Sequence, residues 1–313
     1  MKVLPFLPLL LRGPLLRPVR SSSTLIRATA LELVILAGHV LIYPSGLTPE
    51  RRPSPRPAPD SDTGGESGTG RHAGSGPDAE RGAGHDGITR STEATALPTT
   101  GDVRPPVVLL HGFIDNRSVF VLLRRSLARH GWRRLESLNY SPLTCDIRTA
   151  AELLDRHVEE ICARTGHHEV DIVGHSLGGL IARYYVQRLG GDRRVRTLVT
   201  LGTPHGGTSA VPLAGAHPIV RQMRSGSELI EELRLPAPGC RTRFVSFWSE
   251  LDRVILPVGA ACVDHPDLDA VNVRVTGIGH LALPVHPAVA SAIRQALESD
   301  GSDVGVPGAA HVA

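Results

Sequence analysis

The residue best placed to do chemistry in this sequence is a serine flanked by glycines. Residues 174–178 read GHSLG, which fits the pattern G-x-S-x-G. An apolar, strand-like run (residues 170–173) precedes it, and a helical pattern (residues 179–189) follows it. On a sharp strand-to-helix turn, glycines two positions before and after the serine let its hydroxyl project above a sheet edge. The spacing therefore predicts that Ser176 is a nucleophile, rather than part of a chance glycine-rich turn.

A serine hydroxyl is a weak nucleophile, so it needs a base and a carboxylate that orients the base. On sheets of this kind the acid follows the serine and the histidine comes last. His280 directly follows a strand-like run, residues 271–279, near the end of the regular part of the chain. It is the predicted base, in preference to His265 and His286, which lie in less strand-like contexts.

The acid is expected where the strand before His280 ends. Residues 244–249 form a strand-like run, and Glu250, Asp252 and Asp264 follow it. Asp252 stands at the tip of a turn that leads to Pro257, and it is the predicted acid. Glu250 is more typical of a solvated surface charge or of a local pair with an arginine.

An ester carbonyl under attack develops an oxyanion, which two preorganised backbone N–H groups can stabilise. Leu177, directly after the serine, is one predicted donor. Phe113 is the other, because it follows the apolar run 107–110 in the loop HGF, where Gly112 lets the backbone turn closely. The candidates for contact with substrate are His111, Gly112, His175 and His205, although a structural role is the alternative for each histidine.

The elements that position these residues are strands alternating with helices. From residue 105 to about residue 300, apolar β-branched runs alternate with helical patterns, which predicts an α/β fold with a mostly parallel central sheet and helices on both faces. Residues 203–235, after the strand that ends at Pro204, are expected to form a small cap over the site. Its apolar residues favour an apolar substrate, and a plain strand-to-helix excursion is the alternative.

Several motifs together resemble the α/β-hydrolase superfamily, and best its lipase and esterase branch as found in actinobacteria. They are HGF, GHSLGGLIARYYV, LVTLGTPHGGT, WSELDRVILP and GIGHLAL, within residues 105–296. The resemblance implies the α/β-hydrolase fold, a serine hydrolase that cleaves carboxylic esters, an ester or lipid substrate, and no cofactor. Acyl transfer or amide hydrolysis by the same residues stays open, as does a catalytically silent protein that binds a lipid or partner.

The remainder of the chain divides by composition. Residues 1–44 are apolar, and residues 45–104 are rich in Pro, Gly and Ser with few large aliphatic side chains, which predicts a disordered linker. Residues 105–300 form the predicted catalytic domain and 301–313 a flexible tail. The apolar run 25–43 contains Arg27 and Glu32. An atypical export signal, a membrane-embedded or interfacial helix, and a helix packed on the catalytic domain are its three interpretations, so the protein is expected to be membrane-associated or secreted.

Charge and cysteine content limit the remaining possibilities. The 313 residues carry a formal charge of +3 and no basic block interleaved with aromatics, so no nucleic-acid partner is expected. No metal is expected either, because no ligand motif such as H-E-x-x-H occurs. Cys145 and Cys162 bracket a predicted helix and lie about 25 Å apart, too far to bridge. Cys240 and Cys262 flank the acid loop and could form a disulfide, which would imply an oxidising compartment.

Overall fold

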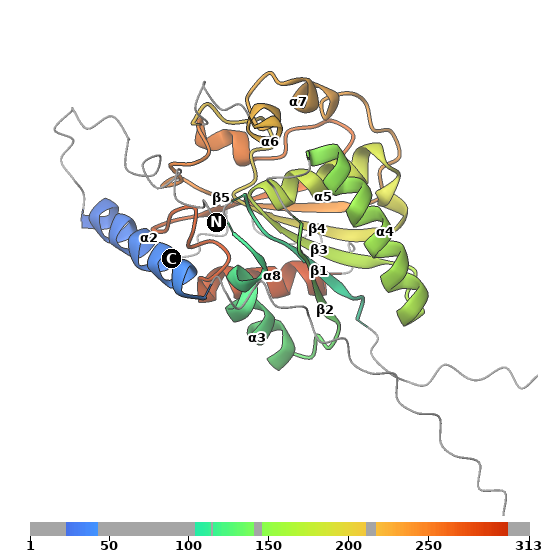
Figure 1. Ribbon diagram of the computed structural model, residues 1–313, viewed down its shortest axis with the longest axis horizontal. Coiled ribbons are helices and arrows are strands. Elements are labelled where there is room, and N and C mark those ends of the chain that lie inside the picture. The colour runs from blue at the N-terminus through green and yellow to red at the C-terminus, as the bar shows by residue number, and fades with distance from the viewer. Residues whose placement is uncertain (1–22, 43–103, 114, 141–145, 211–216, 300–313) are drawn as a thin grey trace, which may run out of the picture. The chain divides into compact units, whose positions relative to one another are not determined.

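The computed structural model describes residues 23–42, 104–113, 115–140, 146–210 and 217–299. In this part of the chain, six strands form one sheet in the order β2-β1-β3-β4-β5-β6, and all neighbouring strands are parallel (Figure 1). The strands are β1 (Val107–Leu110), β2 (Leu135–Leu138), β3 (Val170–His175), β4 (Val195–Leu201), β5 (Arg243–Ser249) and β6 (Asp269–Val275).

The direction in which successive strands are added to the sheet reverses once. The chain begins at β1 inside the sheet, moves outward to β2, and returns to β3 on the other side of β1. In open parallel sheets, ligands bind outside the carboxyl ends of the strands at such a switch point. A ligand site is therefore expected at the loops after β1 and β3.

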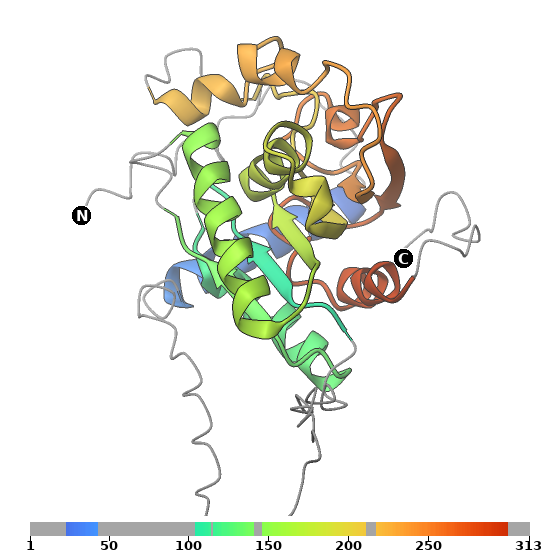
Figure 2. The same cartoon turned by 90° about the vertical axis from the view of Figure 1, so that its right-hand side faces the viewer.

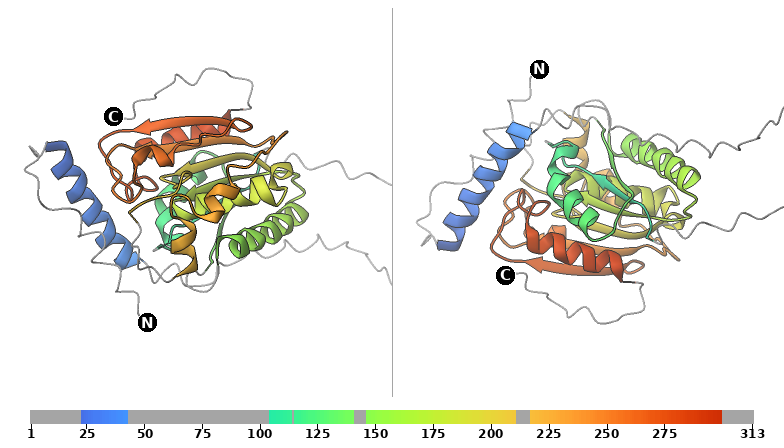
Figure 3. Two further views of the ribbon diagram at one scale, coloured as in Figure 1. Left: turned by 90° about the horizontal axis from the view of Figure 1, so that it is seen from above. Right: turned by 90° about the horizontal axis from the view of Figure 1, so that it is seen from below.

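Helices cover both faces of the sheet, as the turned views show (Figure 2 and Figure 3). The helices are α2 (Ser23–Ile42), α3 (Val121–Arg129), α4 (Ile147–Thr165), α5 (Leu177–Arg188), α6 (Pro218–Gln222), α7 (Glu228–Glu232) and α8 (Pro287–Glu298), with short 3-10 turns η3 (Arg117–Phe120), η4 (Gly191–Arg193) and η5 (Val258–Ala261). Side chains alternate across a strand, so Val108 and Leu110 pack with α4 and α5, whereas Val107 and Leu109 pack with α3 and α8. This two-sided burial explains why β1 and β3 are apolar along most of their length.

Local signals determine where the main crossover helix begins and ends. The Asp146 carboxylate accepts a hydrogen bond of 2.8 Å from the N–H of Thr149 and caps the N-terminus of α4. Gly166 ends the same helix in the left-handed conformation (φ 73°), which glycine adopts without steric cost. The helix lies where the sequence pattern predicts it, and it returns the chain from the edge strand β2 to β3.

The predicted cap corresponds to α6 and α7, which follow β4. That strand ends at Leu201, three residues before the predicted Pro204. Of the apolar residues expected to line the site, Ile219, Val220 and Met223 are buried, and Ile219 and Met223 belong to the core that also contains α4 and α5. These side chains therefore serve the packing of the fold. Residues 211–216 lie outside the described ranges.

Helix α2 lies in the same compact unit as the sheet. Its inward face carries Ala28, Glu32 and Ile35, at the spacing that places residues on one side of a helix. None of the helices in the described ranges combines the length and the hydropathy that crossing a bilayer requires. The predicted linker (45–104), apart from Arg104, and the predicted tail (301–313) lie outside the described residues.

The expectation of a disulfide between Cys240 and Cys262 is wrong, because both are free thiols. The two cysteines lie beside different parts of β5. Ser246 donates a hydrogen bond of 2.7 Å to the carbonyl oxygen of Ala261, so Cys262 lies beside the middle of the strand. Cys240 precedes the strand, and the backbone from Ser246 back to Arg243 alone spans about 10 Å, more than the Cα separation of about 7 Å that a disulfide tolerates.

Candidate active site

Ser176 occupies the turn between β3 and α5 in a strained backbone conformation. Among the described residues it is the only non-glycine residue with a positive φ (52°, with ψ −116°). Such a conformation costs on the order of 1–3 kcal/mol, and it persists where the surrounding structure holds it. The N–H of Ser176 donates to the carbonyl oxygen of Leu201 (2.9 Å), and its own carbonyl accepts from Thr203 Oγ1 (3.0 Å).

The glycines around the serine are required by close backbone packing. A Cβ on Gly174 would lie 2.6 Å from the backbone nitrogen of Gly179, and a Cβ on Gly178 would lie 2.3 Å from the carbonyl oxygen of Leu110. Both distances are shorter than van der Waals contact. The serine turn can therefore sit directly against the end of β1 only if these positions lack side chains.

Asp252 and His280 come together because β5 and β6 are neighbours in the sheet. Asp252 follows the end of β5, and His280 follows the end of β6. The distance between His280 Nδ1 and Asp252 Oδ2 is 2.7 Å, and both side chains are buried. The other carboxylate oxygen of Asp252 accepts hydrogen bonds from the N–H groups of Val254 (2.8 Å) and Ile255 (2.9 Å).

The charges of this pair stabilise each other against burial. Burial alone would raise the pKa of Asp252, but His280 and the two N–H donors outweigh it and lower the pKa below its ordinary value. Burial alone would lower the pKa of His280, but Asp252, with smaller contributions from Glu32 and Asp115, raises it. The carboxylate is thus held ionised, and the imidazole is made a stronger base.

The end of β4 connects the histidine to the serine turn. A Cβ on Gly202 would lie 2.9 Å from His280 Nδ1, and the next residue, Thr203, donates to the Ser176 carbonyl. The ring of His175, the residue before the serine, lies 4.9 Å from the ring of His280 between centroids. Ser176, Asp252 and His280 therefore belong to one cluster of loops at the carboxyl edge of the sheet.

The loop after β1 lies against the same cluster. A Cβ on Gly112 would lie 3.5 Å from the Cβ of Ser176 and 3.2 Å from His175 Nδ1, so a side chain here would crowd the serine turn. Phe113, a predicted oxyanion donor, follows directly in this loop. Leu177, the other predicted donor, is the first residue of α5, where backbone N–H groups have no partner within the helix.

Two of the candidate substrate-binding histidines, His111 and His175, make contacts within the protein. His175 Nδ1 lies 3.2 Å from Asp115 Oδ2, and its Nε2 lies 3.4 Å from the carbonyl oxygen of His280. His111 stacks on Tyr140 with ring centroids 4.3 Å apart, and its Nδ1 lies 2.8 Å from the carbonyl oxygen of Gly112. His175 thus contacts the loops that carry Asp115 and His280, and His111 contacts the loop that carries Gly112.

The ring of His205 contacts the strand that precedes it in the chain, β4. Its ring is buried and its Nε2 lies 3.0 Å from Thr200 Oγ1, which in turn donates to Ser246. Burial, together with the nearby Arg183, lowers its pKa well below the ordinary value. These contacts link β4 to β5, and contact of His205 with substrate stays a prediction.

The alternative acid and bases have other contacts. Glu250 forms an ion pair with Arg274. His265 Nε2 lies 3.0 Å from the carbonyl oxygen of Leu235. His286 stands at the N-cap position of α8, where its side chain makes no capping hydrogen bond. Within the described ranges, no group of three or more His, Cys, Asp or Glu side chains is arranged to hold a metal ion.

Sequence reasoning missed Glu32 as a residue near the site. Its two carboxylate oxygens accept hydrogen bonds of 3.0 Å each from the N–H groups of Leu281 and Ala282, directly after His280. The available signal was a single carboxylate within an otherwise apolar run. A carboxylate in such a place needs a partner, and no sequence pattern indicates that the partner lies some 250 residues later.

Known proteins resemble this chain in sequence and in fold. The sequence model of the palmitoyl protein thioesterase family matches residues 106–251. A triacylglycerol lipase of Burkholderia plantarii is 32% identical over 136 residues, which are 40% of this chain and 37% of the lipase. A triacylglycerol lipase of Pseudarthrobacter phenanthrenivorans is 30% identical over 118 residues, which are 35% of this chain and 36% of the lipase. The chain thus covers little more than a third of these relatives.

A crystal structure of lipase B from Aspergillus fumigatus superimposes with a TM-score of 0.56 at 16% identity, over 63% of this chain and 53% of the lipase. At that identity the likeness concerns the fold. Together with the parallel six-stranded sheet, these similarities confirm the predicted fold class. The chain has the α/β-hydrolase fold, and over residues 106–251 its sequence is similar to the palmitoyl protein thioesterase family.

Proposed function

We propose that this protein hydrolyses carboxylic esters through an acyl-enzyme on Ser176, with His280 as the base and Asp252 as the orienting acid. The observation that carries the proposal is the 2.7 Å hydrogen bond between Asp252 and His280, in the same loop cluster as a strained serine. The lipase names of the relatives agree with this chemistry.

The proposed reaction has two halves. His280 Nε2 accepts the proton of Ser176 as Oγ attacks the ester carbonyl, and the N–H groups of Leu177 and Phe113 stabilise the oxyanion. Collapse of this intermediate expels the alcohol, which takes the proton from His280. A water molecule, deprotonated by His280, then attacks the acyl-enzyme. The bond between the acyl carbon and Ser176 Oγ breaks, Oγ takes the proton back from His280, and the acid is released, while Asp252 stays ionised throughout.

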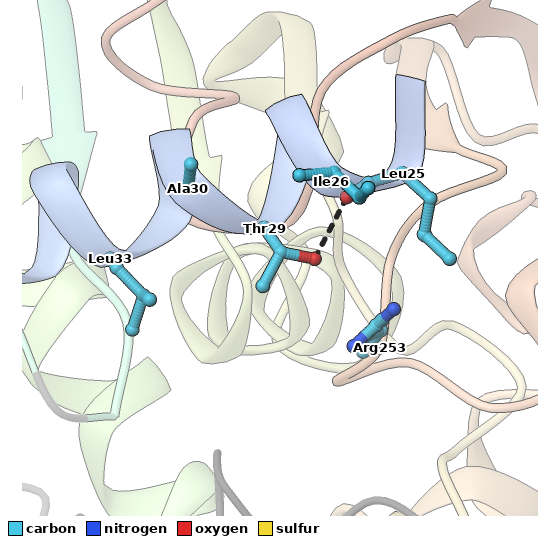
Figure 4. Close-up of a pocket in the computed structure, with 6 residues that line it drawn as sticks. All are labelled: Leu25, Ile26, Thr29, Ala30, Leu33 and Arg253. Carbon is cyan, nitrogen blue, oxygen red and sulfur yellow. Dashed lines mark hydrogen bonds between the residues drawn. The ribbon is translucent and has the colours of Figure 1, made fainter. Parts of the chain in front are cut away.

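We propose an apolar acyl chain as the group that the enzyme recognises. A groove of about 380 Å³ lies between α2 and the acid loop, lined by Leu25, Ile26, Thr29, Ala30, Leu33 and Arg253 (Figure 4). Arg253 directly follows Asp252, so the groove begins beside the acid loop. Predominantly apolar walls with few polar groups are typical of sites for apolar ligands. Both lipases and palmitoyl protein thioesterases, by name, act on acyl substrates.

The outer side of α2 supports a proposal of contact with a lipid surface. Val34 is 68% exposed and Leu31 is also exposed, and they continue the apolar surface of Ile26 and Leu33, which line the open groove and are 59% and 52% exposed. An exposed apolar stripe on a helix beside a hydrolytic site suits an enzyme that works at a lipid–water interface. Contact with the interface, rather than passage through a bilayer, is what we propose for this helix.

The experiment that tests the function is a series of p-nitrophenyl esters from acetyl to palmitoyl, measured with the full chain. We expect turnover that Ser176→Ala abolishes and a preference that rises with acyl length. Matched acyl thioesters, amides and an added alcohol acceptor distinguish ester hydrolysis from thioester hydrolysis, amide hydrolysis and acyl transfer. Full activity in Ser176→Ala would disprove the proposed nucleophile, and no turnover of any ester would favour a binding protein.

A further inference from the structure

Glu32 joins the N-terminal helix to the loop that carries His280. Its two carboxylate oxygens accept from the consecutive N–H groups of Leu281 and Ala282, both at 3.0 Å. The Glu32 carboxylate also lies against Gly279, the residue that precedes His280. A Cβ on Gly279 would lie 2.7 Å from Cδ and 2.8 Å from Oε1 of Glu32, so the carboxylate occupies the space that a side chain there would fill.

The arrangement follows from how α2 packs. Ala28 and Ile35 lie on the same face of the helix as Glu32, Ala28 is buried, and Ile35 packs against the core beneath α3 and α8. A carboxylate on the inward face of an apolar helix loses hydration and must recover hydrogen bonds from the protein. Here it recovers two, both from the backbone of the histidine loop. The contact is specific to a carboxylate, because it pairs two acceptor oxygens with two parallel donors.

The titratable groups that face His280 come from four separate parts of the chain. Asp252 from the loop after β5 bonds to Nδ1, and Asp115 lies in the loop after β1. His175 from β3 lies against the ring, and Glu32 contributes from α2. Glu32 is the member of this set that belongs neither to the sheet nor to the loops after its strands.

We propose that Glu32 is a positioning residue for His280, which holds the histidine loop in place through its hydrogen bonds from Leu281 and Ala282. The inference rests on the proposed function, in which His280 is the base. It implies that the N-terminal helix completes the hydrolytic site, so that the helix and the histidine loop act as one unit.

The charge of Glu32 affects the pKa of His280. Burial alone would raise the pKa of Glu32, and the hydrogen bonds from Leu281 and Ala282, together with His280, partly offset this. The negative charge of Glu32 in turn raises the pKa of His280. Removal of the charge should therefore lower the pKa of His280. A residue that only stabilised the fold would not shift this pKa.

The main test replaces Glu32 by its uncharged isostere in the full chain. For Glu32→Gln we expect kcat on a soluble short-chain ester to fall at least about tenfold with little change in KM, because small misplacements of a catalytic group are costly. We also expect the acidic limb of the kcat/KM profile to move to lower pH. The matched control is Arg27→Gln, which removes an exposed charge from the same helix and should leave both quantities unchanged.

A second variant displaces the carboxylate without altering it. Gly279→Ala places a methyl group where the Glu32 carboxylate lies, so it should push the carboxylate away and give the same shift of the acidic limb. If it acts through Glu32, its effect should largely disappear in a Glu32→Ala background, a non-additivity that identifies coupled residues. If the Glu32 variants fail to fold, the shift of the acidic limb in Gly279→Ala alone still tests the proposal, and an unshifted limb there would overturn it.

The outcomes separate this inference from the proposed function. An unshifted acidic limb in Glu32→Gln, or additive effects of Glu32→Ala and Gly279→Ala, would overturn the positioning role while loss of activity in Ser176→Ala still supported the hydrolase. A drop in melting temperature with an unshifted limb would show that Glu32 is only an anchor of the helix. Persistence of activity in Ser176→Ala would instead remove the function on which the inference rests.

Discussion

The imidazole of His280 and the carboxylate of Asp252 lie 2.7 Å apart, although 28 residues separate them in the sequence. The pair forms because each residue follows the end of one of two neighbouring parallel strands. Asp252 uses its second oxygen to accept two backbone hydrogen bonds, so its position is held from both sides. This relationship determines how the site should respond to mutation and to pH.

Ser176→Ala and His280→Ala should each reduce kcat by about 10⁴-fold or more on a short-chain ester, because residues that act as one unit lose their effect together. The double variant should be about as inactive as either single variant. Steady-state assays of the three proteins test this. His265→Ala and His286→Ala are the controls, since the Asp252 carboxylate bonds to the ring of His280 and to neither of theirs, and loss of activity in either would contradict the assignment of the base.

The pH profile should reflect the raised pKa of His280. The base must be neutral to accept the serine proton, so kcat/KM should fall as pH drops through the pKa of the free enzyme. Because Asp252, Glu32 and Asp115 outweigh the effect of burial, the midpoint should lie above the ordinary histidine value of 6.5. In Asp252→Asn the limb should move to lower pH and kcat should fall by about 10³-fold or more. A midpoint below the ordinary value in the wild type would contradict this account.

The ion pair between Asp171 and Arg196 should contribute to stability in a pH-dependent manner. Asp171 is fully buried, Arg196 Nη2 lies 2.7 Å from its Oδ2, and burial, only partly offset by Arg196, raises the pKa of Asp171 to about 6. Removal of Arg196 leaves a buried carboxylate without its cation, so Arg196→Met should lower the free energy of unfolding by about 3 kcal/mol at neutral pH.

The sign of the pH dependence follows from the raised pKa. A buried acid with a raised folded-state pKa destabilises the fold as pH rises through its titration, and without Arg196 that pKa rises further. The stability difference between wild type and Arg196→Met should therefore widen with pH above about 6. Denaturant unfolding at several pH values measures it. Arg194→Met, which breaks an exposed pair with Glu159, is the control and should cost less than about 1 kcal/mol. A constant difference across pH would argue against a charged Asp171.

The free state of Cys240 and Cys262 predicts that reductant has no effect on stability. Thermal unfolding of the native protein should give the same midpoint with and without dithiothreitol. Thiol titration of the denatured protein should also give the same count with and without prior reduction. A midpoint that falls in reductant would show a disulfide and would contradict the separation that β5 imposes.

Contact of α2 with a lipid surface predicts that an exposed charge on its outer side weakens binding. Val34 is 68% exposed, and Val34→Asp should reduce binding to phosphatidylcholine vesicles by at least about tenfold, since burial of such a side chain contributes about 1.5 kcal/mol or more. Vesicle co-sedimentation measures the change. Leu122→Asp, at an apolar position on α3 that is 53% exposed, is the matched control. Equal binding by wild type and Val34→Asp would argue against the interfacial helix.

The sequence by itself was sufficient to predict the main strands and helices and to nominate the candidate nucleophile, Ser176, and the candidate base, His280. Periodicity within contiguous residues predicted strands and helices such as β3 and α4, and the turn around Ser176 is recognisable because its glycine requirements act within five residues. These are local constraints, and a linear pattern records them directly. The fold class followed from the alternation of buried strands with helices.

Only the tertiary structure decided which distant residues meet. Strand register places Asp252 beside His280 while Glu250 turns to Arg274, and the same register keeps Cys240 from Cys262. The packing of α2 brings Glu32 to the histidine loop, where an apolar run with one carboxylate could equally have indicated a membrane segment. Contacts of this kind depend on how whole helices and strands pack against each other. The packing that leaves the fewest buried polar groups unpaired is favoured, and no local sequence pattern contains that information.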